Sequence, residues 1–205
     1  MSPVTAMGAV AGPVRRRRAA AKGLIDAAEA THNPFALAEA LYAYGGYAFR
    51  DADPVRALEA QRRGLVIAQD SGNRFIESNL ATVLSQLEAE HGDPLAALDH
   101  LTLAIRNFYD SGNFGLIRPA LATLAVFLAR LGRLEPAATI AGFALNPLTA
   151  RVPEFSTAIT HLRDVLGEAT YESLARKGET MTSAAMVTYA FDQIDQARTE
   201  LEHPS

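Results

Sequence analysis

The tetrapeptide Asp-Ser-Gly-Asn occurs twice in this chain of 205 residues, with Gly72 and Gly112 placed 40 positions apart. A stretch with the apolar spacing of a helix precedes each copy. Glycine adopts the left-handed conformation that ends many helices without the steric cost met by other residues. Asparagine is a preferred cap for the start of a helix. The tetrapeptide is therefore predicted to end one helix and to begin the next, as at Asn73.

The similarity between the two copies extends beyond the tetrapeptide. With an offset of 40, residues 53–59 align with residues 93–99, and Gly92 aligns with Gly132. A period of about 20–50 residues is typical of stacked supersecondary units. Each unit is expected to contain two helices with apolar surface on both sides, which neighbouring units must bury.

One helix of a unit is predicted within residues 53–72. Asp53 is expected to cap its N-terminus, and Pro54 suits the first helical position, where no N–H is needed. Val55 and Leu58 then begin an apolar side with helical spacing.

The other helix is predicted at residues 74–92, and its counterpart one period later at 114–132. Pro119 in that counterpart either kinks the helix or marks its true beginning. Gly45 and Gly64 are expected to let the two helices of a unit approach each other closely.

The small residues of these units resemble the tetratricopeptide consensus. The positions that match it are Gly45, Ala52-Asp53, Ala57-Leu58 and Gly64, then Gly92-Asp93, Ala97-Leu98 and Ala104, then Gly132 and Ala137. The period exceeds the usual length of about 34 residues. It is similar to the extended repeats of large bacterial signalling regulators, namely LuxR-type, ATPase-coupled transcription regulators and adenylate or guanylate cyclases.

The C-terminal part strengthens this resemblance. The residues similar to the closing segment of those regulators are Leu166-Gly167, Tyr171, Gly178 and Met181. An amphipathic final helix is predicted to cover the apolar face of the last repeat. Its inward residues are expected to be Met186, Val187, Ala190, Phe191 and Ile194.

The predicted fold is therefore all-α: a tetratricopeptide-like solenoid of helical hairpins, with a period of about 40 and a C-terminal helical cap. We expect a flexible leader at residues 1–12, repeats at 13–146 and a helical capping subdomain at 147–205. The junction is expected within residues 146–155, which contain two prolines.

The composition favours a cytoplasmic globular protein. The chain is 49% hydrophobic and 20% charged, has a net charge of −4 and contains no cysteine, so disulfides and thiolate metal sites are excluded. The longest uncharged apolar run, residues 119–129, is shorter than the roughly 20 residues that span a bilayer. No membrane association is predicted.

The sequence contains no recognisable reaction centre. The five histidines are scattered, and Glu88-x-x-His91 is a single motif where a carboxylate-bridged metal site needs two. There is no Gly-x-Ser-x-Gly elbow, and no phosphate-binding Gly-x-x-x-x-Gly-Lys-Ser/Thr loop. We therefore predict a non-catalytic protein without metal or cofactor.

A partner-binding groove is the function that the resemblance implies, because the first helix of each tetratricopeptide pair lines the concave side. The repeat register assigns partner-binding positions to Tyr42, Asn79, Thr82, Gln86 and Glu90. The matching positions of the third unit, Ala122, Val126 and Ala129, predict an apolar groove there. The alternative is that these residues pack against a neighbouring helix or the cap.

A second candidate is the run Arg15, Arg16, Arg17 and Arg18, which could bind nucleic acid or another anion by neutralising phosphates. The run has no interleaved aromatic residues. A solvated entry to the first helix is the favoured interpretation, and nucleic acid is not the expected partner.

Three functional hypotheses follow. The first is a regulatory module of a bacterial signalling protein that binds another protein or another module of its parent regulator. The second is a sensory domain that binds a small effector and regulates a cyclase or ATPase module. The third is nucleic-acid binding through the arginine run. An open polar groove favours the first, and a closed apolar pocket the second.

Overall fold

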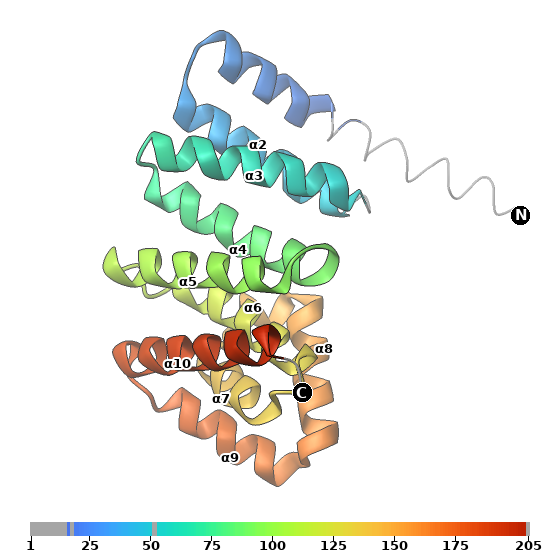
Figure 1. Ribbon diagram of the computed structural model, residues 1–205, viewed down its shortest axis with the longest axis vertical. Helices are drawn as coiled ribbons and strands as arrows, with labels where there is room; N and C mark the ends of the chain where they lie inside the picture. Colours follow the sequence, from blue (N-terminus) through green and yellow to red (C-terminus); the bar gives the residue numbers. More distant parts are fainter. Residues whose placement is uncertain (1–15, 17–18, 51–52, 204–205) are drawn as a thin grey trace, which may run out of the picture. The chain divides into compact units, whose positions relative to one another are not determined.

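The computed structural model describes residue 16 and residues 19–50 and 53–203, with the side chains of 47, 49 and 50 left out. The chain divides into two compact units, residues 1–87 and 88–205. All regular structure in the described residues is helical, without a strand (Figure 1). The all-α prediction is therefore confirmed, while the predicted leader at 1–12 lies outside the described residues.

The first unit is a set of helices in which α2 and α3 pack along each other. Residues 19–30 are helical and are followed by α2 (Pro34–Arg50), α3 (Pro54–Asp70) and the greater part of α4 (Arg74–His91). Ala48, Ala57 and Leu87 form a buried cluster of this unit, against which Leu58 and Val83 pack. The many alanines let the helices approach closely.

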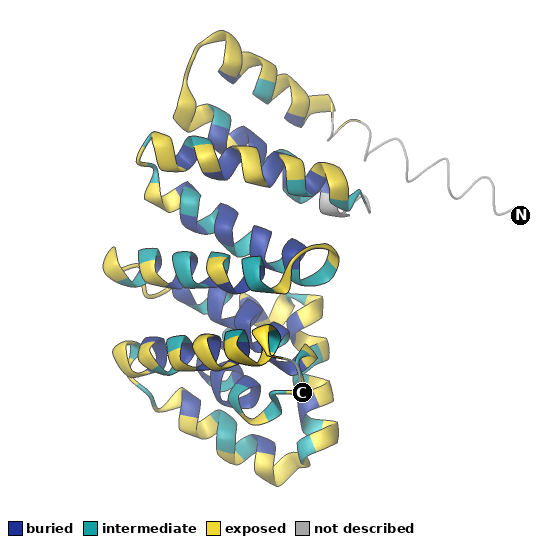
Figure 2. Ribbon diagram, in the orientation of Figure 1, coloured by how far each residue is buried: buried dark blue, intermediate teal, exposed yellow. Residues whose placement is uncertain are grey.

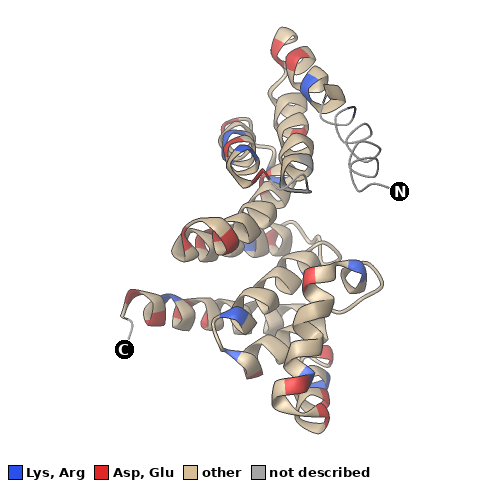
Figure 3. Ribbon diagram, turned by 90° about the vertical axis from the view of Figure 1, so that its right-hand side faces the viewer, with Lys and Arg blue, Asp and Glu red and all other residues tan. Residues whose placement is uncertain are grey.

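The second unit is built around α6 and α7, most of whose residues are buried (Figure 2). Its elements after α4 are α5 (Pro94–Asp110), α6 (Ile117–Arg130), α7 (Leu134–Ala144), a short 3-10 helix (Thr149–Arg151), α8 (Pro153–Leu166), α9 (Glu168–Glu179) and α10 (Ser183–Glu202). Helix α7 packs against both α6 and α9. Charged residues are few along α6 and α7 (Figure 3).

Four helices of the described chain end in the same turn. A residue with positive φ follows each helix: His32 (50°), Gly72 (70°), Gly112 (71°) and Gly132 (78°). The next residue donates its N–H to the carbonyl five positions earlier: Asn33 to Ala28 at 3.2 Å, Asn73 to Ala68 at 2.8 Å, Asn113 to Phe108 at 2.9 Å and Arg133 to Leu128 at 2.9 Å. These bonds satisfy carbonyls that would otherwise lack partners at the helix end. The predicted role of Asp-Ser-Gly as a stop signal is confirmed at both copies.

The turn at His32 is an earlier member of the same series, and the sequence analysis missed it. His32 lies 40 positions before Gly72 and has the same left-handed backbone although it carries a side chain. Asn33 caps α2 as Asn73 caps α4, by accepting from the N–H three residues later at 3.1 and 3.2 Å. The turn was missed because His32 stands where the other turns have glycine, so the tetrapeptide does not occur here.

At the second copy the predicted helix start was wrong. The side-chain amide of Asn113 donates to the Ser111 hydroxyl at 2.8 Å, and α6 begins only at Ile117 instead of 114. Pro119 explains the delay, because a helix starting earlier would place a residue without an N–H in its interior. Beginning at Ile117 puts Pro119 in the first turn, where the N–H has no intrahelical partner. One of the two roles predicted for Pro119 is thereby confirmed.

The other predicted signals of α3 are confirmed, with two corrections. Asp53 accepts a hydrogen bond from the Arg56 N–H at 3.3 Å, and Pro54 occupies the first turn. Val55 is exposed rather than buried, since it lies on the outer side of that turn. Gly45 was expected to let the two helices of its unit approach closely. The space beside it is instead occupied by the side chain of Gln61.

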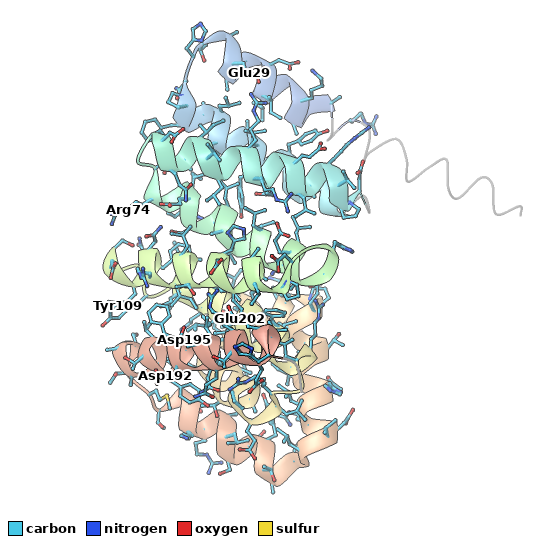
Figure 4. The ribbon with its side chains drawn as sticks, in the orientation of Figure 1. Glu29, Arg74, Tyr109, Asp192, Asp195 and Glu202 are labelled. Carbon is cyan, nitrogen blue, oxygen red and sulfur yellow. The ribbon has the colours of Figure 1, made fainter. Side chains whose placement is uncertain are left out.

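Helix α10 covers more than the last predicted repeat, because it packs against α5 as well as α6 and α7. Of its expected inward residues, Met186, Val187, Ala190 and Ile194 are buried, whereas Phe191 is half-buried with the Arg106 guanidinium 5.8 Å from its ring centroid. Arg133, after the Gly132 turn, anchors α10 by donating to Gln193 at 2.8 Å and to Gln196 at 2.5 Å. Asp192, Asp195 and Glu202 are exposed on α10 (Figure 4).

We expect Gly72→Val to lower the free energy of unfolding by about 1 kcal/mol or more, because a β-branched residue resists positive φ. A Cβ atom at Gly72 meets nothing within 4 Å, so the cost comes from the backbone alone. Gly72→Asn is the matched control and should cost less, since asparagine tolerates this conformation. Urea unfolding of both variants measures the difference, and equal stabilities would contradict the assigned turn.

We expect Gly178→Ala to destabilise the second unit by about 1–3 kcal/mol through overpacking. A Cβ atom there would lie 1.8 Å from the Thr139 carbonyl oxygen, and one at Gly142 would lie 2.0 Å from that of Ala175, so α7 and α9 would have to separate. Gly46→Ala is the control: Gly46 lies inside α2 with nothing near a new Cβ, and its replacement should stabilise by about 0.5–1 kcal/mol. Thermal or urea unfolding that ranks the two variants the other way would refute this packing.

Candidate functional site

The candidate site is an open groove of about 520 Å³ between α6 and α8, within the second unit. Helix α6 contributes Val126, Ala129 and Arg130 from its C-terminal half. Helix α8 contributes Pro153, Glu154, Thr157, Ala158 and His161 from its first turns. Small and apolar side chains thus form most of the floor, and three ionisable groups stand among them.

The segment between α7 and α8 fixes the direction in which α8 leaves. The Thr149 hydroxyl is buried and donates to the Ala144 carbonyl at 2.9 Å. The Asn146 side-chain oxygen accepts from the N–H groups of Leu148 at 2.8 Å and Thr149 at 3.0 Å. This turn ends at Pro153, which starts α8 at its first helical position. Helix α8 then runs across α6 and α7 instead of alongside them (Figure 1).

Two arginines hold the helices around the groove. Arg118 of α6 donates to the Phe143 carbonyl and lies with its guanidinium 4.7 Å from that ring, which ties α6 to the end of α7. Arg163 of α8 pairs with Glu172 of α9 at 2.6 Å and covers the ring of Tyr171 at 4.6 Å. Burial raises the pKa of the Tyr171 hydroxyl, which keeps it neutral under the arginine.

Arg130 is oriented by Glu90, one of the residues predicted to bind a partner. The guanidinium donates to the Glu90 carboxylate at 2.7 Å, and the two side chains are 43% and 22% exposed. Glu90 therefore lies beside the groove and acts on it through Arg130. Within the described chain, the side chains of Glu154 and His161 make no hydrogen bond or ion pair. The groove thus presents polar groups whose bonding capacity is not used internally.

Of the three positions that the repeat register assigned to an apolar groove in the third unit, two line the groove and one is buried. Val126 and Ala129 line the groove. Ala122 is buried, with 5% of its surface exposed. Sequence reasoning missed the contribution of α8, although residues 154, 157, 158 and 161 share one helical face. No local signal indicates which helix that face meets.

The remaining predicted residues lie on α2 and the first part of α4, in the other unit. Asn79 donates to the Phe75 carbonyl at 2.8 Å and Thr82 to the Ser78 carbonyl at 2.9 Å, both within α4. Tyr42 and Gln86 are half-buried. A partner-binding role for these side chains stays a prediction.

The first unit has its own open groove, of about 430 Å³, between residues 19–30, α2 and α3. Its charged lining is largely paired, with Lys22 2.9 Å from Asp26 and Arg63 2.5 Å from Glu29. The hydrogen bond to Asp26 raises the pKa of the Lys22 ammonium. Glu29 is among the side chains labelled in Figure 4.

Of the arginine run, Arg16 is exposed, whereas Arg15, Arg17 and Arg18 lie outside the described residues. The described part of the chain contains no group of three His, Cys, Asp or Glu side chains able to hold a metal ion. The same part contains no helix with the length and apolar content needed to cross a membrane.

Comparison with protein-family models, with curated proteins and with solved structures found no match to this chain.

We expect Glu90→Gln to change the free energy of unfolding by less than about 1 kcal/mol, because its ion pair with Arg130 is partly exposed. The change should nevertheless release the guanidinium, which the arginine Nε–H resonance of Arg130 reports by NMR. Arg130→Gln identifies that resonance by its loss. An Nε–H signal that does not shift in Glu90→Gln would show that the pair is not formed in solution.

Proposed function

We propose that this chain is a non-catalytic, cytoplasmic interaction module of a bacterial signalling or transcription regulator. Its α6–α8 groove binds a segment of another protein, or of another module of the same regulator. The observation that carries this proposal is an open, mostly apolar groove that also holds Arg130, Glu154 and His161. The sequence resemblance to LuxR-type regulators and nucleotide cyclases suggests the biological setting.

We further propose that the helical hairpins stack as a tetratricopeptide-like solenoid with a period of about 40 residues and a C-terminal cap. The turns at His32, Gly72 and Gly112 support this arrangement, because the same left-handed geometry recurs at intervals of 40. In such a stack, the helices that line one side offer a continuous surface to a partner.

The groove is open but mostly apolar rather than polar, and its openness is the property that favours a polypeptide over a small effector. A small ligand is usually enclosed, with most of its surface buried in a preformed cavity. This groove is open and extends over two turns of α8, from Pro153 to His161. An apolar side chain laid on Val126 and Ala158 would lose water contact while its backbone remained near the polar groups. Such a combination of apolar centre and polar rim is typical of protein interfaces.

The test is a pair of valine substitutions on the two groove-related helices. Val126→Arg places a long charged side chain on the groove floor, where it would exclude an apolar side chain of the partner. It should weaken binding by at least about ten-fold, which corresponds to a loss of about 1.4 kcal/mol in binding free energy. Val165→Arg is the control, because Val165 is exposed on α8 and does not line the groove. Peptides selected from a displayed random library on the purified chain serve as ligands, with affinity measured by fluorescence anisotropy.

Both variants should keep their helical circular dichroism, because Val126 is only half-buried and Val165 is exposed. Equal affinities for Val126→Arg and the unmodified chain would rule out the groove as the binding surface. Selected peptides that bind Val165→Arg as weakly as Val126→Arg would point to a different face of α8.

A further inference from the structure

We propose that the α6–α8 groove selects a dipolar segment: an extended stretch with an apolar residue flanked by one acidic and one basic residue. This inference rests on the proposed function and adds the chemistry of the partner. It follows from the charges that line the groove, which are of both signs and are incompletely paired within the described chain.

Arg130 supplies the site for the acidic residue. A guanidinium carries five N–H donors in a fixed plane, and the hydrogen bond from Arg130 to Glu90 uses one terminal nitrogen. That bond holds the side chain in position while the other donors stay available. With the arginine already oriented, a carboxylate gains a charge-assisted bond at a smaller cost in side-chain entropy.

Glu154 supplies the site for the basic residue. It lies in the first turn of α8, where the helix dipole favours a negative charge. Its carboxylate is exposed and forms no ion pair with another described residue. An acidic group placed against it would be repelled, whereas a lysine or arginine would be attracted. Repulsion of the wrong charge gives selectivity as well as affinity.

The length of the groove along α8 limits the length of the segment that can lie in it. Glu154 and His161 are seven residues apart on α8, which corresponds to about 10 Å along the helix axis. An extended chain covers this distance in about three residues. The part of the segment that lies along α8 is therefore expected to span about three residues, with its apolar side chain over Val126 and Ala158.

The experiment compares selections from one random heptapeptide library on four forms of the purified chain: unmodified, Val126→Arg, Arg130→Gln and Glu154→Gln. Peptides enriched on the unmodified chain and lost on Val126→Arg are the groove ligands. We expect these peptides to share the dipolar pattern. Arg130→Gln should remove the preference for the acidic residue, and Glu154→Gln the preference for the basic residue, each with a loss of about ten-fold in affinity for the original peptide.

Arg176→Gln and Glu179→Gln are matched controls, because both residues are exposed on α9 away from the groove. They should leave the selected pattern unchanged, and circular dichroism verifies that every variant is folded. Groove-dependent peptides without the paired charges would overturn this inference and leave the proposed function standing. If no enriched peptide depends on Val126, the proposed function fails and the inference fails with it.

Discussion

The carbonyl groups at the end of a helix need hydrogen-bond partners, and this requirement shapes most of the chain. Four helices meet it in the same way, with a left-handed residue followed by an N–H that bonds five positions back. The turn redirects the chain within three residues, and in the second unit α6 then packs against α5 and α7 against α6. At Gly132 it also positions Arg133, whose side chain donates to α10 within the second unit. The same local backbone conformation thus ends four helices and, at Gly132, positions the residue that holds a distant segment.

The groove lies next to the connection between α7 and α8, which bends α8 across α6. After α7 there is no left-handed turn; Asn146 and Thr149 instead organise a short 3-10 segment that sends α8 across α6. A helix that crosses another leaves an angle beside the contact, and the small side chains Ala129 and Ala158 do not fill it. Beside it, α7 and α9 pack tightly through Gly142 and Gly178. The proposed binding surface is in this way a consequence of the change in helix direction.

The features predicted well from sequence are those whose cause is local. Gly72, Gly112 and Asp53 have signals within a few residues of where they act, and the all-α class follows from many such signals. His32 adopts the same turn without glycine, and a search based on residue type could not find it. Asn113 does not cap α6 with its side chain, because Pro119, six positions later, delays the start of that helix to Ile117. The groove forms where α8 contacts α6, and this contact depends on tertiary packing that no short motif encodes. The repeat register therefore located Val126 and Ala129 but not Glu154 or His161.

The recurring turn is the central claim, and the hydrogen bonds that define it can be observed directly. In a long-range HNCO experiment on the deuterated protein, scalar coupling across a hydrogen bond connects the donor amide with the acceptor carbonyl. The structure predicts correlations from Asn73 to Ala68, from Asn113 to Phe108 and from Arg133 to Leu128, all five residues back. Correlations four residues back at these amides, or different patterns at the two Asp-Ser-Gly-Asn copies, would contradict it.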